Sequence, residues 1–592
     1  MKAGLLALGT LIWAAPVLAQ DPLAPLPQSP PPVAAAPIKP PAPPVSIQTQ
    51  GQAVPVVQQP ATVAVPRDWR GVLDAIDSGN WASARAGIAA LPQGVLTPLA
   101  KAELYTAKGS PLVELAAIEA LLAEAPELPQ ADQLARMAIT RGATTAPLIV
   151  VPRRTMNLGS PPGRYRARPI QGEPLADALR ALLDPLVKAN DAAGAEAQLL
   201  TYGPQLSFEA RAEAGQRVAW TYYQLGMDGE ARRVADTWRQ GAVGDWAPQA
   251  AWVSALASWR QGDCNAASAA FQQVGRTAQQ RELRAGAYYW AARSEQACRR
   301  PRSVAPLLRA AAASPESFYG LVARESLGME TKLPADPHVA RDPVIEHLPN
   351  VRRALELVRI GEPALAEELL RHQAKIGLPA EHHALIQLAK RLDLPAAQLW
   401  LANNGQPGAV ADAADRYPNP AWSPLNGWRV DPALAYGHIV QESAFRRTAV
   451  STAGAVGLMQ VLPTTAEMVS RNRGVPYSRA IMTNPIYNLE YGQSFIEMMR
   501  GNSATAGQLP RVIASYNAGP LPVGRWAAIN DRGDPLLWIE SIPYWETRYY
   551  VPAVLRNMWV YQGLNSQQAP TLKAMAEHRW PPFPTGMTRL AH

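Results

Sequence analysis

Cysteine is scarce in this sequence, with only Cys264 and Cys298 among 592 residues. Two cysteines without nearby paired histidines do not make a zinc site, so we expect no metal, and we expect no cofactor. In an oxidising compartment the two thiols can form a structural disulfide, which is the interpretation we favour. The alternative is a pair of buried, unpaired thiols that pack as small apolar side chains.

Long hydrophobic runs are also missing. The apolar run from Leu5 to Ala15 is shorter than the roughly 20 residues of a membrane-spanning helix, and no later stretch is long and charge-free enough. Lys2 precedes this run and Val17–Ala19 follows it, which predicts a signal peptide over residues 1–19. A lipid anchor would need a cysteine in place of Gln20. We therefore expect a soluble, exported protein without a transmembrane segment.

Dense tracts of one charge are absent, although the net charge is +8. The basic residues are scattered and mostly arginine, without the Lys/Arg tract or interleaved aromatic pattern of a nucleic-acid binder. We expect no nucleic-acid partner. The charge would suit an anionic polymer, but a solvated surface explains it equally well.

Charge is nearly missing from residues 20–66, which are rich in proline, alanine, valine and glutamine. Such a segment cannot bury enough apolar surface to fold, so it predicts an extended linker or a disordered tail. From Asp68 to Asn403 the chain is rich in alanine, leucine and arginine with helical spacing and almost no β-branched alternation. This pattern predicts an all-α fold, with a long loop between Arg141 and Pro174 where proline and glycine increase.

A repeated glycine and alanine pattern indicates how these helices are arranged. Four glycines are each followed five positions later by an alanine: Gly79 and Ala84, Gly226 and Ala231, Gly262 and Ala267, Gly361 and Ala366. Glycine can end one helix while alanine lets the next helix cross closely. The separation of Gly226 and Gly262 is close to one antiparallel helix pair, which predicts a degenerate tetratricopeptide-like superhelix. Chance spacing in an alanine-rich chain is the alternative.

A chemically suggestive carboxyl group lies in the C-terminal third. Asp431 and Pro432 predict a helix start, with aspartate as N-cap and proline in the first turn. Glu442 would share a buried face of this helix with Ala435 and Ile439 and would lie near the helix C-terminus. Burial and the negative end of the helix dipole both raise the pKa of a carboxyl group, which favours a general acid. The alternative is an interfacial glutamate paired with a following arginine, Arg446 or Arg447.

Five motifs in order decide between these interpretations. The segment from Asp431 to about Leu564 resembles the soluble lytic transglycosylases, whose catalytic domain has a lysozyme-like α-helical fold. The resemblance rests on Gln441–Phe445, Ala453–Ala466, Asn484–Pro485 with Asn488–Leu489, Ala514–Pro520, and Glu540–Tyr544 with Glu546–Val551. Less specific similarity to the helical part of that family lies at Tyr288–Arg293 and Ser317–Leu321. The resemblance implies an enzyme that cleaves peptidoglycan in the periplasm.

The resemblance also implies roles for single residues. Glu442 would be the catalytic acid and then the base, with Ser443 beside it. Met459 and Gln460 would line the sugar-binding site, and Tyr516 and Asn517 would face the sugar nearest the cleaved bond. Tyr550 would hydrogen-bond close to the glutamate. Core packing is the alternative role for each aromatic residue.

The distribution of acids separates two reactions open to this fold. Glycoside hydrolysis usually needs two carboxylates, yet no Asp or Glu follows Glu442 until Glu467. In the family's mechanism a single glutamate protonates the glycosidic oxygen of the MurNAc-β-1,4-GlcNAc bond, the N-acetyl group helps to stabilise C1, and the C6 hydroxyl closes on C1 to give a 1,6-anhydro product. The local lack of a second acid favours this route, although Glu540 or Glu546 could fold back towards the site.

These observations predict a division of the chain. We expect a signal peptide (1–19), a proline-rich linker (20–66), a tetratricopeptide-like helical domain (67–346), a helical linker domain (347–418), a lysozyme-like catalytic domain (419–564) and a C-terminal tail (565–592). The alternatives to a lytic transglycosylase are a goose-type lysozyme-like hydrolase and a non-catalytic scaffold. The helical array could also bind other cell-wall enzymes.

Overall fold

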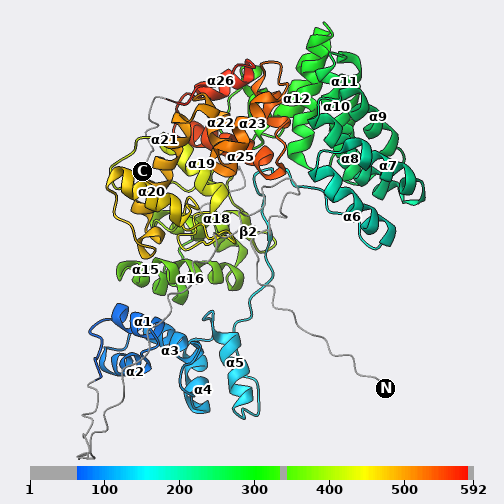
Figure 1. The fold of residues 1–592 in the computed structure, drawn as a ribbon. Coiled ribbons are helices and arrows are strands. Elements are labelled where there is room, and N and C mark those ends of the chain that lie inside the picture. The colour runs from blue at the N-terminus through cyan, green and yellow to red at the C-terminus, as the bar shows by residue number, and fades with distance from the viewer. Residues whose placement is uncertain (1–62, 334–342, 585–592) are drawn as a thin grey trace, which may run out of the picture.

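The computed structural model describes residues 63–333 and 343–584, and the predicted signal peptide and nearly all of the predicted proline-rich linker lie outside these ranges. The described chain is mostly helical, as expected (Figure 1). The sheet in these ranges consists of two short antiparallel strands, β1 (Met156–Asn157) and β2 (Asn404–Gly405), with Met156 opposite Gly405. The all-α fold class is therefore confirmed.

The helices fall into four groups along the chain. The first group is α1 (Trp69–Asp77), α2 (Trp81–Ala90), α3 (Thr97–Thr106), α4 (Leu115–Glu124) and α5 (Ala131–Thr140). The second is α6 (Pro174–Lys188), α7 (Ala192–Tyr202), α8 (Phe208–Gln224), α9 (Asp228–Trp238), α10 (Trp246–Arg260), α11 (Cys264–Thr277), α12 (Arg281–Ala297), α13 (Pro301–Ala312) and α14 (Phe318–Ser326). Successive helices of this second group pack against one another, as in a superhelix.

The third and fourth groups follow. The third is α15 (Pro349–Arg359), α16 (Pro363–Ile376), α17 (His382–Arg391) and α18 (Pro395–Asn403). The fourth is α19 (Pro432–Glu442), α20 (Pro463–Arg473), α21 (Pro485–Gly501), α22 (Leu509–Ala518), α23 (Pro520–Arg525), α24 (Pro535–Glu540), α25 (Trp545–Leu564) and α26 (Pro570–Ala576). Short 3₁₀ helices connect some of them: η1 (Gly203–Gln205), η2 (Pro379–Glu381), η3 (Ala413–Arg416), η4 (Ala480–Thr483), η5 (Ser503–Thr505) and η6 (Trp526–Ala528).

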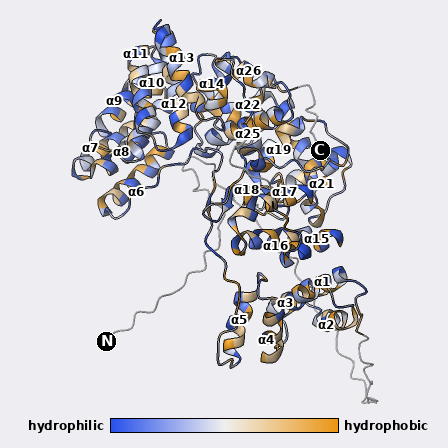
Figure 2. Cartoon of the chain, turned by 180° about the vertical axis from the view of Figure 1, so that it is seen from behind, coloured by the Kyte–Doolittle hydropathy of each residue, from blue (hydrophilic) through white to orange (hydrophobic). Residues whose placement is uncertain are grey.

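The glycine and alanine pattern has the predicted structural role. Gly79, Gly226, Gly262 and Gly361 all lie between helices with φ of 74°, 76°, 77° and 85°, a region that side chains disfavour. The alanines that follow, Ala84, Ala231, Ala267 and Ala366, are all fully buried. Hydrophilic and hydrophobic residues share the same helices (Figure 2), so each helix can bury one side against its neighbours.

The helices are divided between two large hydrophobic cores. One core joins α1–α5 to α15–α18, and the other joins α6–α14 to α19–α26 and includes Ala396 and Leu399 of α18. Glu127, after α4, links the parts of the first core: its carboxylate pairs with Arg353, and its carbonyl oxygen accepts from Asn350 at 2.9 Å. The predicted helical domain (67–346) is therefore divided between two cores, because α1–α5 share their core with the predicted linker domain and α6–α14 share theirs with the C-terminal helices.

The predicted loop before α6 runs between the two cores. Its Arg153 amide donates to the Lys375 carbonyl oxygen at 2.9 Å, and its Leu158 amide donates to the Asn403 carbonyl oxygen at 2.9 Å. Further along, Arg164 Nη1 lies 2.7 Å from a carboxylate oxygen of Glu540. This irregular segment thus connects the helical array, α6–α14, to the C-terminal helices, α19–α26.

The C-terminal helices pack directly on the array. The Tyr223 and Ser541 hydroxyls lie 2.8 Å apart, and the rings of Phe318 and Trp559 stack at 5.3 Å. The expected C-terminal tail contains α26, whose Leu572 and Met575 are buried. In its described part this segment is therefore a packed element.

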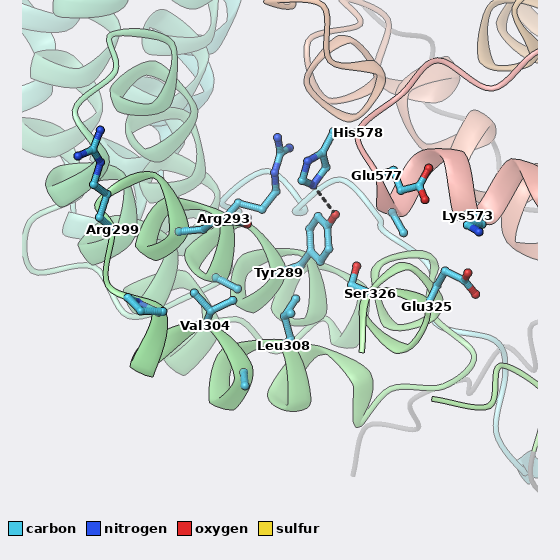
Figure 3. A pocket seen from close by; sticks show the side chains of 15 residues that line it. Tyr289, Arg293, Arg299, Val304, Leu308, Glu325, Ser326, Lys573, Glu577 and His578 are labelled. Carbon is cyan, nitrogen blue, oxygen red and sulfur yellow. Dashed lines mark hydrogen bonds between the residues drawn. The ribbon is translucent and has the colours of Figure 1, made fainter. Parts of the chain in front are cut away.

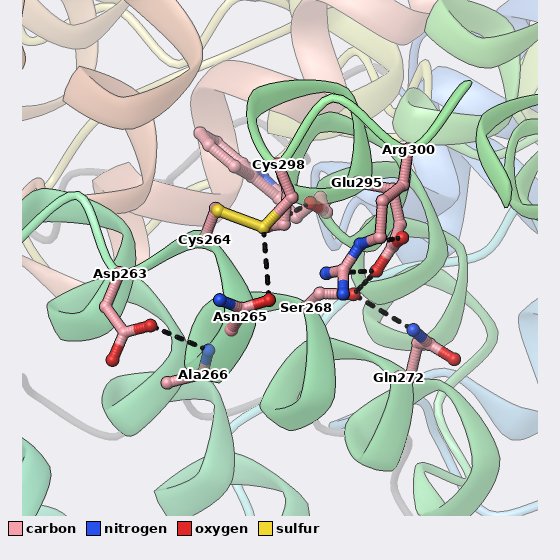
Figure 4. The surroundings of a disulfide bond; sticks show 11 residues. Asp263, Cys264, Asn265, Ala266, Ser268, Gln272, Glu295, Cys298 and Arg300 are labelled. Atoms are coloured by element: carbon pink, nitrogen blue, oxygen red, sulfur yellow. Dashed lines mark hydrogen bonds and ion pairs between the residues drawn. A yellow bond between two sulfur atoms is a disulfide. The ribbon is translucent and has the colours of Figure 1, made fainter.

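The predicted disulfide is confirmed. Cys264 and Cys298 are bonded, and their Cα atoms are 5.5 Å apart (Figure 4). The bond joins the first residue of α11 to the residue that ends α12, so it closes one antiparallel helix pair. No helix among the described residues combines the length and apolar character needed to cross a membrane.

Candidate active site

Helix α19 positions Glu442 as its last residue. The Asp431 side chain caps the helix start by accepting from the Ala433 amide at 2.9 Å, and Pro432 occupies the first turn. Ala435, His438 and Ile439 are fully buried, as the predicted apolar face requires. This packing holds the helix end in place.

Glu442 has the electrostatic properties of a general acid near neutral pH. The Tyr550 hydroxyl, from α25, donates to Glu442 Oε1 at 2.5 Å. Burial of the carboxyl group raises its pKa to about 7, the Tyr550 hydrogen bond opposes this increase, and the negative charge of Glu546 adds to it. Glu442 Oε2 accepts no hydrogen bond from the described residues.

The following arginines do not form an ion pair with Glu442. Arg446 Nε donates to the Ser443 carbonyl oxygen at 3.1 Å, and the Arg447 guanidinium lies 4.8 Å from the centre of the Trp422 ring. Within the described chain no cation therefore pairs with the Glu442 carboxyl to offset the increase in its pKa.

Two other carboxylates were candidates for a partner acid. Glu540 is 1% exposed and is held by Arg164 and by the Tyr319 hydroxyl, which donates at 2.7 Å. It serves the contact with the helical array. Glu546 is exposed, accepts from Asn517 Nδ2 at 3.2 Å and acts on the charge of Glu442. Glu546 is thus the carboxylate that the fold brings towards Glu442.

A loop after α19 carries Met459 and Gln460. Asn488 on α21 fixes this loop: its Oδ1 accepts from the Met459 amide at 2.8 Å, and its Nδ2 donates to the Val456 carbonyl oxygen at 3.0 Å. Met459 is fully buried, whereas Gln460 has a φ of 47° and donates to the Gly457 carbonyl oxygen at 2.8 Å. In this structure the Gln460 carboxamide therefore supports its own loop.

Helix α22 contributes Tyr516 and Asn517. The Tyr516 hydroxyl donates to the Met459 carbonyl oxygen at 2.7 Å, which links α22 to the loop. Asn517 Oδ1 accepts from the Thr547 hydroxyl at 2.6 Å, which links α22 to α25. Ser443 is buried beside Glu442 and ends α19. The expected site residues are thus gathered around the end of α19.

His438 is a member of this cluster that the sequence did not identify. It is fully buried, its Nδ1 lies 2.6 Å from the Tyr550 hydroxyl oxygen, and its ring centre is 4.5 Å from that of Tyr516. Burial lowers the pKa of its imidazole to about 3, so the ring is neutral at physiological pH. The only sequence signal was its position one helical turn before Glu442.

A cluster of possible metal ligands and a cavity lie outside the group of residues around Glu442. His383, Asp412 and Asp415 bring metal-type ligand atoms together, but both Asp415 oxygens already accept hydrogen bonds, from Gln387 Nε2 and from the Asp412 amide, each at 3.1 Å. A cavity of about 1100 Å³ lies between α12–α14 and α26, where the Tyr289 hydroxyl meets His578 (Figure 3). It contains none of the residues around Glu442.

Known proteins are similar to the part of the chain that contains Glu442. The Transglycosylase SLT domain model matches residues 423–539. The soluble lytic murein transglycosylase of Escherichia coli is 28% identical over 278 residues, which are 44% of this chain and 41% of that protein. The membrane-bound lytic murein transglycosylase C of Actinobacillus pleuropneumoniae is 35% identical over 99 residues, 15% of this chain and 27% of that protein. The chain thus spans less than half the length of these curated relatives.

A solved structure extends the similarity beyond that domain at the level of fold. An inactive mutant of the lytic transglycosylase Slt from Pseudomonas aeruginosa superposes with a TM-score of 0.52 at 20% identity, covering 84% of this chain and 86% of that one. The helical array and the C-terminal domain therefore both belong to a known architecture. Residues 423–539, which contain Glu442, Met459 and Tyr516, belong to the transglycosylase SLT domain family.

Proposed function

We propose that this protein is a lytic transglycosylase that cleaves the MurNAc-β-1,4-GlcNAc bond of peptidoglycan and leaves 1,6-anhydro-MurNAc ends. The observation that carries the proposal is Glu442, a carboxyl group with a pKa of about 7 and one oxygen free of hydrogen bonds from the described residues. Such a group is protonated often enough to act as an acid and ionised often enough to act as a base. We further propose that the protein acts in the periplasm after export.

The proposed reaction uses Glu442 twice. The carboxyl first donates its proton to the glycosidic oxygen, the bond from C1 to that oxygen breaks, and the N-acetyl group of the substrate helps to stabilise C1. The Glu442 carboxylate then removes the proton of the C6 hydroxyl, and the C6 oxygen forms a new bond to C1. No water is consumed, and the glutamate regains its proton for the next cycle.

We assign the surrounding residues to substrate binding. Tyr516 and Asn517 lie on the helix that adjoins both the Met459 loop and α25, so they can contact the sugar next to the cleaved bond. Met459 and Gln460 would form the opposite side through the loop backbone. Ser443 would support the end of α19, and Tyr550 would stabilise the carboxylate form of Glu442.

The first test replaces the proposed acid. Glu442→Gln should abolish the turbidity loss of purified sacculi while preserving the helical circular dichroism of the protein. Glu467→Gln, at an exposed carboxyl on α20, is the matched control and should clear sacculi like the wild type. Unchanged clearing by the Glu442→Gln variant would show that Glu442 is not the catalytic acid. Loss of clearing by this variant would argue against a purely scaffolding protein.

A second test identifies the product. Mass spectrometry of digested peptidoglycan should show muropeptides lighter by one water than hydrolysis products. Products of full hydrolytic mass would instead support a goose-type lysozyme-like hydrolase, the second candidate. Glu546 is the observation in favour of that candidate, because it acts electrostatically on Glu442 and could activate water. Glu546→Gln should leave anhydro products unchanged in kind if Glu442 works alone.

A further inference from the structure

His438 is the buried group of the site that the proposed reaction leaves without a role. It lies on α19 one turn before Glu442, and its Nδ1 is 2.6 Å from the Tyr550 hydroxyl oxygen. The same oxygen is 2.5 Å from Glu442 Oε1. The Tyr550 hydroxyl thus bridges the imidazole and the proposed catalytic carboxyl.

The number of available protons limits the directions in which these two hydrogen bonds can run. A tyrosine hydroxyl has one proton, so Tyr550 can donate to Glu442 or to His438 but not to both. The imidazole is neutral, because burial lowers its pKa to about 3, and it therefore carries one N–H. The two bridging contacts are both satisfied when His438 donates to Tyr550 and Tyr550 donates to Glu442.

The second imidazole nitrogen supports the same tautomer. His438 Nε2 is buried and has no hydrogen-bond partner among the residues that the structure describes. With the proton on Nε2, a buried N–H would be left unsatisfied, and the bare Nδ1 would compete with Glu442 for the Tyr550 proton. With the proton on Nδ1, only a lone pair is left without a partner. The ring of Tyr516, 4.5 Å from the imidazole, limits rotation of the ring out of this geometry.

We propose that His438 is a positioning residue, whose Nδ1–H donates to the Tyr550 hydroxyl and so directs the tyrosine proton to Glu442 Oε1. This inference rests on the proposed role of Glu442. Because Oε1 then accepts from Tyr550, the catalytic proton resides on Oε2, the oxygen without a hydrogen bond from the described residues. The histidine thereby determines which oxygen of the acid faces the glycosidic bond.

The two hydrogen bonds from His438 to Tyr550 and from Tyr550 to Glu442, which we call the relay, also act after Glu442 has released its proton. The Glu442 carboxylate retains the Tyr550 hydrogen bond, and a hydroxyl that accepts a hydrogen bond is a stronger donor. His438 therefore stabilises the ionised form of Glu442 without contacting it. The titratable groups facing Glu442 are Tyr550 and Glu546 on α25 and Tyr516 on α22, and only Tyr550 also hydrogen-bonds His438.

Substitution of His438 tests the relay. His438→Leu fills the same buried space with an apolar side chain of similar size and removes the donor. On soluble glycan strands its kcat should fall about 10- to 100-fold while KM changes less than about twofold, because the Tyr550 hydroxyl, which donates to the charged Glu442 carboxylate, is no longer oriented by His438. The alkaline limb of its pH profile should move to higher pH, because the carboxylate loses an oriented donor. His438→Asn, whose side-chain amide can donate from nearly the same position, should restore most of the rate.

A double-mutant cycle separates this role from packing. If His438 acts through Tyr550, His438→Leu should change the rate of Tyr550→Phe by less than about twofold. Independent, multiplicative losses from the two substitutions would overturn the relay. If the leucine variant fails to fold, the asparagine variant decides: an asparagine enzyme with wild-type pH dependence supports the proposal, and a loss equal to that of Tyr550→Phe refutes it.

The result is distinguishable from failure of the proposed function. An active Glu442→Gln enzyme would refute the function itself, whatever the His438 variants do. An inactive Glu442→Gln enzyme together with a fully active His438→Leu enzyme would refute only the positioning role.

Discussion

Replacing Glu442 by Gln should stabilise the protein at alkaline pH while it abolishes catalysis. The folded-state pKa of about 7 lies above the ordinary 4.5. Between these values the folded chain keeps a proton that the unfolded chain has released, so the free energy of unfolding falls as pH rises through this window. The destabilisation caused by ionising the buried Glu442 carboxyl is complete above pH 7 and absent well below pH 4.5. Glutamine cannot ionise, so the Glu442→Gln protein does not lose this free energy of unfolding.

The size of the effect follows from the pKa difference. A change from 4.5 to about 7 corresponds to about 3 kcal/mol, since each unit is worth about 1.4 kcal/mol. Glu442 is only half-buried as a residue, and screening by solvent reduces the expectation to about 1–3 kcal/mol. For a domain of about 150–250 residues that is an increase of about 2–12 °C in Tm at pH 8.

Thermal unfolding at pH 5 and pH 8 is the assay. The Glu442→Gln protein should exceed the wild type in Tm at pH 8, and the difference should shrink at pH 5. Glu467→Gln, at an exposed carboxyl of the same domain, should show no such pH-dependent difference. An equal Tm increase at both pH values, or a lower Tm at pH 8, would refute the reasoning that burial sets the pKa of Glu442.

Three other predictions follow from the geometry. Clearing of sacculi should be half-maximal near pH 7 on the alkaline side and fall about tenfold per pH unit above it, because protonated Glu442 is required; a flat profile to pH 9 would contradict this. Gly457→Ala should reduce activity strongly, because φ is 81° and a Cβ would lie 2.4 Å from Asn488 Nδ2 and so displace the Met459 loop; wild-type kinetics would refute this role. Reducing the bond between Cys264 and Cys298 should cost about 3–4 kcal/mol in the chain-entropy account, read as a lower Tm, and both thiols of the unreduced, unfolded protein should be inert to a thiol reagent.

Local rules explain which parts of the fold could be predicted from the sequence. The glycine turns, the start of α19 at Asp431 and the apolar face below Glu442 each depend on residues within a few positions of one another. The disulfide was predictable because a chain with two cysteines has one possible intramolecular pairing. The helix ending in Glu442 was thus accessible before any tertiary contact was known.

The remaining features depend on contacts between distant segments. The shared core of α1–α5 with α15–α18, the pairing of β1 with β2, and the packing of α26 join residues that no local pattern connects. His438 illustrates the same limit within the site. Its spacing from Glu442 was visible, but the meeting with Tyr550, on a helix more than a hundred residues later, was not. Its role therefore emerges only from the folded chain.

Two carboxylates besides Glu442, those of Glu540 and Glu546, differ in their surroundings. The sequence excludes a nearby acid after Glu442, yet it leaves Glu540 and Glu546 as candidates. The structure commits Glu540 to Arg164 and Tyr319 at the contact with the helical array. Glu546 is exposed and hydrogen-bonded to Asn517, and its negative charge raises the pKa of Glu442. A carboxylate that keeps the acid protonated supports proton donation by Glu442, which is consistent with a lone acid and base whose nucleophile comes from the substrate.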